Sequence, residues 1–269
     1  PNVTSIDDGA FAGCELIPEI TIPDSVLSIG LSAFNGCAGA TSLTLGPNVT
    51  SIGTSAFSGC PSLRSIALTK NQYASYGNTN YIDSSVLQYI NILFRNTDGN
   101  TNLSQTEALA QKPGSGNYGA VFSTNVESIG LGAFYNDTRI VAITMSDSVL
   151  SIGDEAFLGC SGATSLTLGQ SLTSIGIITF RVCIRIQSIT IPDSVLSIGM
   201  QAFRGCSGAT SLTLGPNVTS IGASAFADCT SLRSIILTKD QNTSYASNAY
   251  FHYSVLQYIK ILLTNTDGR

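Results

Sequence analysis

A serine-isoleucine pair returns every 23 residues along most of this chain, and this period constrains the fold more than any other feature. A phenylalanine follows each isoleucine of the pair five residues later. A unit this short cannot bury its own apolar face, so it must stack on its neighbours. The sequence therefore predicts a solenoid with two interior columns, made by the isoleucines Ile6, Ile29, Ile52, Ile129, Ile152, Ile175, Ile198 and Ile221 and by the phenylalanines Phe11, Phe34, Phe57, Phe134, Phe157, Phe180, Phe203 and Phe226.

A glycine follows the isoleucine in most units, and we expect it to adopt a turn conformation closed to other residues. The second half of each unit alternates polar and apolar residues and then meets proline or glycine, as in residues 188–192 and 42–46. This alternation predicts one short strand per coil. Side by side, these strands would form a parallel sheet with isoleucine and leucine inside and hydroxyl side chains outside.

The outward hydroxyl columns are candidate binding residues because they would present a regular, uncharged surface. These residues are Ser42, Thr44, Ser65, Ser165, Thr167, Ser188, Thr190, Ser211 and Thr213.

The pattern SxxSIGxxAFxxCxxLxxIxIP is nearly complete in residues 194–214 and resembles the 23-residue leucine-rich repeat of BspA-like surface proteins. The resemblance implies a solenoid of stacked leucine-rich repeats with a parallel β-sheet on one face, mainly β with short turns or 3-10 segments. It also implies a protein that is extracellular or at the cell surface and takes part in adhesion. The chain departs from the pattern at Asp137, where a cysteine is expected, and at Ala40, Ala163 and Ala209, where leucine is usual.

The period divides the chain into coils over 1–69, an inserted island over 70–122, coils over 123–238 and the start of a second island over 239–269. An apolar run over 85–94 and a turn signal over 96–99 predict that the first island holds a hairpin or a small inserted subdomain, followed by a flexible segment over 112–119. Residues 22–69 match residues 191–238 at an offset of 169, so five coils and an island form a larger repeat. No atypical polar coil caps either end, and we expect a section of a longer tandem array. Island tyrosines are further candidate contact residues, at Tyr73, Tyr76, Tyr81, Tyr89, Tyr245 and Tyr250.

The chain contains seven cysteines, and all of them occupy one phase of the repeat. We expect buried free thiols that act as small hydrophobes, and neither a metal site nor a cofactor. His252 is the single histidine, and the aligned position of the first island is Asp83. Because the first island lacks this histidine, His252 gives poor support for a catalytic base, and we expect no enzymatic activity.

Six Asn-x-Ser/Thr sequons permit N-glycosylation if the protein comes from a eukaryotic secretory pathway. Three of them lie in a Pro-Asn-Val-Thr turn, where asparagine also suits the backbone. The sequons begin at Asn2, Asn48, Asn102, Asn136, Asn217 and Asn242.

Charged residues make up 11% of the chain and the net charge is -5, which argues against binding to nucleic acid or to an anionic membrane. The apolar runs fall short of the roughly 18 residues that a membrane span needs. We therefore expect an adhesion or interaction surface for a protein or glycan ligand. The alternative is a subunit of a surface filament that contacts further copies of itself. Ice binding is a remote third possibility, which the interruptions of the threonine column at Ala67 and Ile236 weaken.

Overall fold

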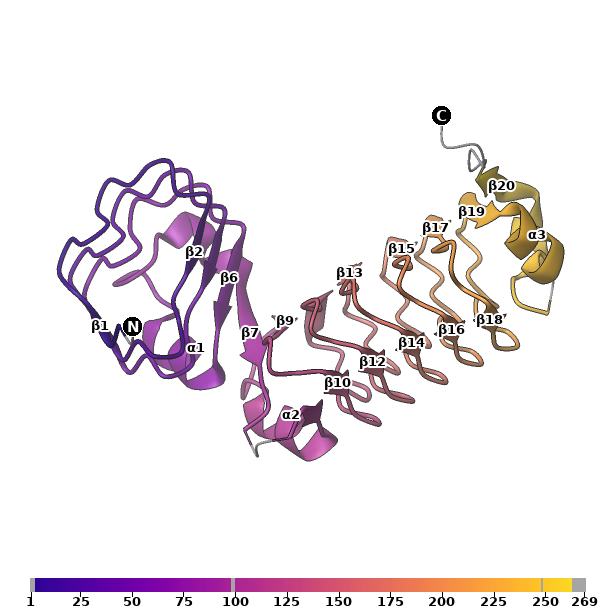
Figure 1. Cartoon of the computed structure of the whole chain (residues 1–269), viewed down its shortest axis with the longest axis horizontal. Helices are drawn as coiled ribbons and strands as arrows, with labels where there is room; N and C mark the ends of the chain where they lie inside the picture. The colour runs from indigo at the N-terminus through magenta and orange to yellow at the C-terminus, as the bar shows by residue number, and fades with distance from the viewer. Residues whose placement is uncertain (1–2, 98–99, 248, 263–269) are drawn as a thin grey trace. The chain divides into compact units, whose positions relative to one another are not determined.

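The computed structural model describes residues 3–97, 100–247 and 249–262 and confirms the predicted solenoid (Figure 1). The chain coils as a parallel β-solenoid of about ten turns with little helix. It divides into two compact units, the first comprising residues 1–93 and 111–113 and the second residues 94–110 and 114–269.

The first unit holds two rows of parallel strands. The Ser-Ile pairs form one row, which we call the marker sheet: β1 (Ser5–Ile6), β3 (Ser28–Ile29) and β5 (Ser51–Ile52). The second half of each coil forms the other row, which we call the hydroxyl sheet: β2 (Glu19–Thr21), β4 (Ser42–Thr44), β6 (Ser65–Leu68) and β7 (Ile90–Phe94).

The second unit repeats this arrangement. Its marker sheet contains β8 (Asn102–Leu103), β10 (Ser128–Ile129), β12 (Ser151–Ile152), β14 (Ser174–Ile175), β16 (Ser197–Ile198) and β18 (Ser220–Ile221). Its hydroxyl sheet consists of two sets of hydrogen-bonded strands. The first set contains β9 (Tyr118–Phe122), β11 (Ile140–Thr144) and β13 (Ser165–Thr167). The second set contains β15 (Ser188–Thr190), β17 (Ser211–Thr213), β19 (Ser234–Thr238) and β20 (Ile259–Leu262). Equivalent residues of successive coils face each other, as Ser188 faces Ser211.

The phenylalanines form a stacked column through the interior, as predicted. In the second unit the ring centroids of Phe134 and Phe157 lie 5.0 Å apart, and those of Phe203 and Phe226 lie 5.4 Å apart. The planes of the second pair are inclined by only 6°. Within each unit, the repeat coils therefore contribute one ring each to a spine, which fixes the register between coils.

The prediction for the glycine that follows the marker isoleucine is wrong. Gly53 and Gly199 do not have a positive φ; instead, a Cβ at either position would collide with the backbone of the preceding coil. Glycine is required here for space. The left-handed conformation occurs two residues later, where φ is 58° at Ser55 and 55° at Gln201.

The hairpin predicted within residues 70–122 is also wrong. The apolar run forms the 3-10 helix η1 (Ser84–Tyr89) and strand β7, and β7 pairs in parallel with β6. Ile82 bridges to Phe57 and so continues the spine. The island is therefore further solenoid, in which helix α1 (Lys70–Tyr76) follows β6 where a coil would carry its marker strand.

Helix α3 (Lys239–Tyr245) follows the plan of α1, because it comes directly after the hydroxyl-sheet strand β19, whereas helix α2 (Gln105–Gln111) comes after a marker strand. Helix α2 lies between β8 and β9. The second island begins with helix α3 and the 3-10 helix η2 (Tyr253–Tyr258), and there Phe251 bridges to Phe226.

A capping box explains why α1 begins where it does. The Thr69 hydroxyl accepts a hydrogen bond from the Gln72 backbone N–H, and the Thr69 N–H donates to Gln72 Oε1 over 2.9 Å. The same amide side chain donates from Nε2 to the Gly46 carbonyl over 2.7 Å, which ties the helix to the preceding coil. Gln241 repeats these contacts in α3, with 2.8 Å from its Nε2 to the Gly215 carbonyl.

Candidate functional site

The outer face of the hydroxyl sheet is the candidate site with the most regular chemistry. The central residue of the three-residue strands points inward: Leu43, Ile189 and Leu212 are at most 1% exposed, and Leu166 is half-buried. The predicted serines and threonines point the other way: Ser165, Thr167, Ser188 and Thr190 are exposed, and Ser42, Thr44, Ser65, Ser211 and Thr213 are half-buried.

None of these nine hydroxyl groups forms a side-chain hydrogen bond within the part of the chain that the structure describes. Threonines just outside the strands behave differently, because Thr164 and Thr210 donate from Oγ1 to the preceding coil, over 3.0 and 3.1 Å. The hydroxyls of the strand face are therefore available to a ligand as both donors and acceptors.

Most of the predicted island tyrosines serve packing. The Tyr76 hydroxyl donates to the Thr50 carbonyl over 2.6 Å, and its ring meets that of Tyr81 edge-on at 5.2 Å. Tyr245 and Tyr250 repeat both contacts, at 2.6 and 5.4 Å. Tyr73 is exposed, and the side chain of Tyr89 lies outside the described residues.

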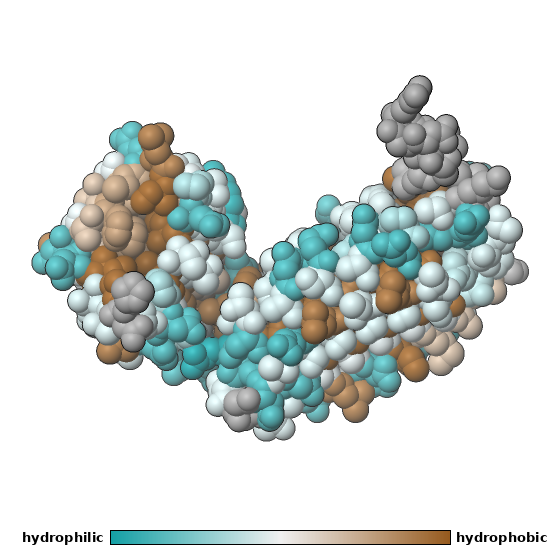
Figure 2. All heavy atoms as spheres, viewed as in Figure 1, coloured by the Kyte–Doolittle hydropathy of each residue, from teal (hydrophilic) through white to brown (hydrophobic). Residues whose placement is uncertain are grey.

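Exposed apolar side chains lie beside the marker sheet of the second unit, and they were not predicted from the sequence. They lie two residues before or after the marker isoleucine, and apolar patches interrupt the polar surface of this unit in Figure 2. Their signal in the sequence is an apolar residue directly after an inward valine, as in Val149-Leu150, or directly after the glycine that follows the marker isoleucine, as in Gly199-Met200. We call this set the apolar ridge; it comprises Leu131, Leu150, Ile177, Leu196 and Met200.

The described sequons lie at the surface. Asn48 and Asn217 each donate from Nδ2 to a backbone carbonyl of the preceding coil, over 2.8 and 2.9 Å, so both have the turn role that competes with glycosylation. Asn102 and Asn136 are exposed, the latter with a φ of 53°. Asn2 and the side chain of Asn242 lie outside the described residues.

The cysteines are free thiols, as predicted, and all but the half-buried Cys14 are buried. Each buried thiol for which a partner is seen donates to the carbonyl of a phenylalanine in the preceding coil, as Cys206 Sγ does to Phe180 over 3.2 Å. Burial is the main cause that raises the pKa of Cys60 from 9.0 to about 11. These thiols are therefore poor nucleophiles and serve the packing.

Asp137 stands where other coils carry a cysteine, and polar partners stabilise its carboxylate there. The Tyr118 hydroxyl, which β9 supplies, donates to Asp137 Oδ2 over 2.7 Å, and Arg139 Nε lies 3.5 Å from Asp137 Oδ1. Burial first, and then the bond to Asp137, raise the pKa of the Tyr118 phenol well above its usual value. The pair thus satisfies a buried carboxylate at the coil that follows the insertion.

The described residues show no cluster of side chains that indicates a catalytic or metal site. His252 Nδ1 lies 2.7 Å from Ser254 Oγ, but the two residues are sequence neighbours in one turn. Within the described residues no group of three or more His, Cys, Asp or Glu side chains could hold a metal ion. No described helix combines the length and the apolar character needed to cross a bilayer.

Comparison with known protein families identifies the family to which this chain belongs. The profile of the BspA-type leucine-rich repeat region matches residues 1–107 and 127–257, in six copies. The chain belongs to the BspA-type leucine-rich repeat family. No curated protein matches it.

Solved structures similar to this BspA-type chain are also leucine-rich repeat proteins. A leucine-rich repeat protein of T. pallidum is 25% identical, with 54% of this chain and 63% of that chain covered and a TM-score of 0.43. One from Bacteroides ovatus is 23% identical over 98% of this chain and 76% of that chain, with a TM-score of 0.45. The pneumococcal vaccine antigen PcpA is 16% identical over 97% of this chain and 72% of that chain, with a TM-score of 0.48. The match to the first of these proteins spans less than two thirds of its length.

Proposed function

We propose that this BspA-type protein is a non-enzymatic extracellular repeat protein whose hydroxyl-sheet face binds a protein or glycan ligand. The observation that carries the proposal is the set of strand hydroxyls that have no side-chain hydrogen bond among the described residues, whereas threonines at neighbouring positions donate to the preceding coil. A surface of uncharged donors and acceptors at a constant spacing suits an extended ligand that is itself rich in polar groups.

The regular geometry favours recognition over a large area. Ser188 and Thr190 of β15 face Ser211 and Thr213 of β17 in register, so adjacent coils offer the same pair of hydroxyls. A single hydroxyl contributes only about 0.5–1.5 kcal/mol, so affinity would come from several coils engaged together. The low charge of the chain, 11% charged residues, leaves little competing electrostatic attraction.

The test is capture of ligands from a glycan array and from a panel of immobilised extracellular proteins. A double variant, Thr167→Lys with Thr190→Lys, places two bulky charges on the proposed face, and we expect it to lose the wild-type signal. The double variant Leu196→Lys with Met200→Lys is the matched control, because it adds the same two charges to the apolar ridge beside the marker sheet. Loss of capture in the control, with the threonine variant unaffected, would assign binding to the apolar ridge and contradict the proposal.

A second candidate is a subunit of a surface filament. The internal repeat favours it, because the contacts of Tyr76 and Gln72 recur at Tyr245 and Gln241 with nearly the same distances. A larger unit built twice in the same way is suited to an array. Electron microscopy of native material separates the candidates, since regular fibres would favour assembly and separate molecules carrying bound ligand would favour adhesion.

A further inference from the structure

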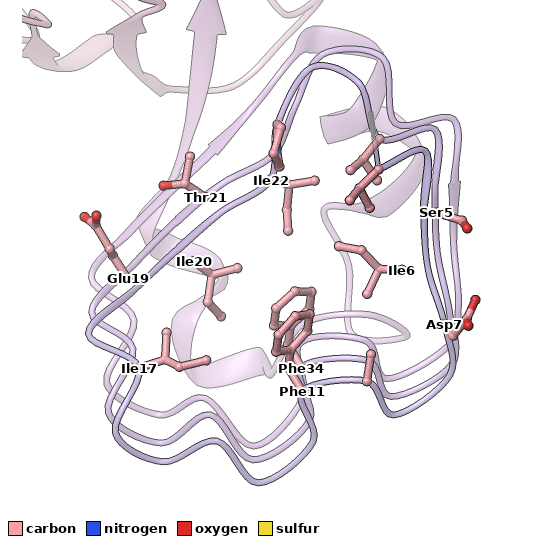
Figure 3. A pocket seen from close by; sticks show the side chains of 14 residues that line it. Ser5, Ile6, Asp7, Phe11, Ile17, Glu19, Ile20, Thr21, Ile22 and Phe34 are labelled. Atoms are coloured by element: carbon pink, nitrogen blue, oxygen red, sulfur yellow. The ribbon is translucent and has the colours of Figure 1, made fainter. Parts of the chain in front are cut away.

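One coil of the second unit differs from the others in the turn between its two strands. A regular coil directs its apolar side chains inward, as Figure 3 shows for the first coil, where Phe11 points into the apolar pocket and Glu19 points away from it. In the coil over 170–192, the turn between β14 and β15 also directs apolar side chains outward, because Val182 is 41% exposed and Ile184 42%. Two successive outward positions of this turn are therefore apolar.

The other coils carry small or polar residues at these two positions. The place of Val182 is taken by glycine, asparagine or aspartate in every other repeat coil. The place of Ile184 is taken by Glu15, Ala38, Pro61, Thr138, Ser161, Ser207 and Thr230. Packing does not explain the exchange in this one coil, because both side chains face solvent.

The backbone of this coil is strained at its branched residues. Val182 has a φ of 63° and Ile178 a φ of 60°, and they are the only β-branched residues with a positive φ in the part of the chain that the structure describes. A branched Cβ crowds the backbone in this conformation, and neighbouring coils place Gly159 and Gly205 at the position of Val182. Strain that burial does not offset is typical of functional positions.

Two arginines flank the exposed apolar pair. Arg181 is half-buried and Arg185 is exposed, and the guanidinium group of neither forms a hydrogen bond or an ion pair within the described residues. Arg204, at the place of Arg181 in the next coil, is already occupied, because its Nε donates to Asp228 Oδ2 over 2.9 Å. The two arginines are therefore free to bind an anionic group.

The turn is positively charged although the chain as a whole is acidic. The coil over 170–192 contains no aspartate or glutamate, whereas the chain has 17 acidic and 12 basic residues. In the preceding coil, Asp154 and Glu155 lie in register with Ile177 and Ile178, ahead of the arginines. Asp154 is occupied there, since its Oδ1 accepts a hydrogen bond from the Ile177 N–H over 2.6 Å.

We infer that this turn is a docking site for an acidic segment of a partner protein, in which carboxylates alternate with apolar side chains. We call it the arginine turn; it comprises Arg181, Val182, Ile184 and Arg185. Each guanidinium group can bind a carboxylate through two parallel N–H···O bonds, and the valine and isoleucine offer apolar surface between the two charges. An anionic bilayer is a poorer partner, because two cations on a chain of net charge -5 give little attraction to it. The inference does not depend on what the hydroxyl sheet binds.

The test measures binding of an acidic peptide to the full chain. The probe is a fluorescein-labelled peptide in which Glu-Leu and Asp-Ile pairs alternate, and binding is followed by fluorescence anisotropy. In the graft variant, residues 181–185 are replaced by Leu-Gly-Cys-Ser-Gly, the sequence of residues 158–162, which form the same turn in the preceding coil. The graft removes both arginines and both exposed apolar side chains and places glycine at the positive φ, so its melting temperature should not fall.

We expect the graft to bind the probe at least about tenfold more weakly than the wild type. Arg204→Ala is the matched control and should change the affinity by no more than about twofold, because it removes an arginine that is already paired. The wild-type affinity should also fall as the salt concentration rises from about 0.1 M to about 1 M, since the Debye length shortens from about 10 Å to about 3 Å.

A charge reversal provides the second test. Arg181→Glu with Arg185→Glu should lose the acidic probe and bind a peptide in which lysine replaces its acidic residues. Equal binding of the probe by the graft and the wild type, or no binding by either, would overturn the inference. Binding of the wild type to phosphatidylserine vesicles but not to the probe would also overturn it, because the partner would then be a membrane surface.

Discussion

Replacing Phe203 by alanine tests whether the phenylalanine column holds the coils together. Phe203 is fully buried, and its ring centroid lies 5.1 Å from that of Phe180 and 5.4 Å from that of Phe226. Removing the ring deletes both stacks and leaves a cavity that cannot collapse easily, because strand pairing fixes the spacing of the coils. We expect a loss of about 3–5 kcal/mol in the free energy of unfolding.

Phe11→Ala is the control within the same column. Its ring has one stacked neighbour, Phe34 at 5.0 Å, and is 41% exposed, so truncation should cost only about 1–2 kcal/mol. Urea unfolding followed by circular dichroism gives both free energies, provided that the m-values agree. Native-state hydrogen exchange adds a local readout, because the Phe203 N–H donates to the Ala225 carbonyl over 2.8 Å and should exchange faster in a loosened coil. Equal losses in the two variants, or a loss below about 1 kcal/mol for Phe203→Ala, would refute the spine.

Three further predictions concern strain, the buried acid and alkaline pH. Val182 has a φ of 63° where Gly159 and Gly205 stand in neighbouring coils, so Val182→Gly should raise the unfolding free energy by about 1 kcal/mol in thermal melts, and a destabilised variant would contradict the assigned strain. Tyr118→Phe removes the donor to Asp137 Oδ2 and should cost about 1–3 kcal/mol, whereas an unchanged urea midpoint would show that water replaces it. Burial raises the pKa of Cys60 to about 11 from 9.0, so the unfolded state loses its proton first: the contribution to stability is complete below pH 9.0 and is lost as the pH rises toward 11. Urea midpoints across this range should fall, and a flat profile would contradict the pKa shift.

The interior could be predicted from the repeat because equivalent residues of the coils occupy the same environment. The inward marker isoleucines, the phenylalanine spine and the outward hydroxyls all follow from one period and from strand alternation. The burial of the cysteines could be predicted too, because residues at the same position of the repeat contact equivalent residues of the preceding coil.

The insertion was harder because its signals are local and its outcome depends on its neighbours. The apolar run over 85–94 fits a hairpin as well as a single strand, and only the edge offered by β6 selects the parallel pairing of β7. The role of Gly53 was misjudged for a similar reason, because the close approach of the preceding coil is a property of the stack. Asp137 needed a partner 19 residues away, Tyr118, which no spacing rule connects to it.

The candidate site was predicted as a face but not as a set of contacts. Alternation within 188–190 was enough to place Ser188 and Thr190 outside. The sequence did not separate free hydroxyls from occupied ones, since Thr167 and Thr164 belong to the same segment and only the latter donates to the preceding coil. It also missed the apolar ridge, which is the competing surface on the second unit.

The most direct test of the hydroxyl-sheet face is a steric block at one position. Thr190→Cys and Met200→Cys are prepared in a Cys14→Ser background, where the remaining native thiols are buried, and each is labelled with a bulky maleimide. Binding is then measured to a glycan or protein that the wild type captures on the array. We expect that the label at residue 190 abolishes binding and that the label at residue 200 leaves it unchanged. Binding that survives the label at 190 and is lost with the label at 200 would contradict it.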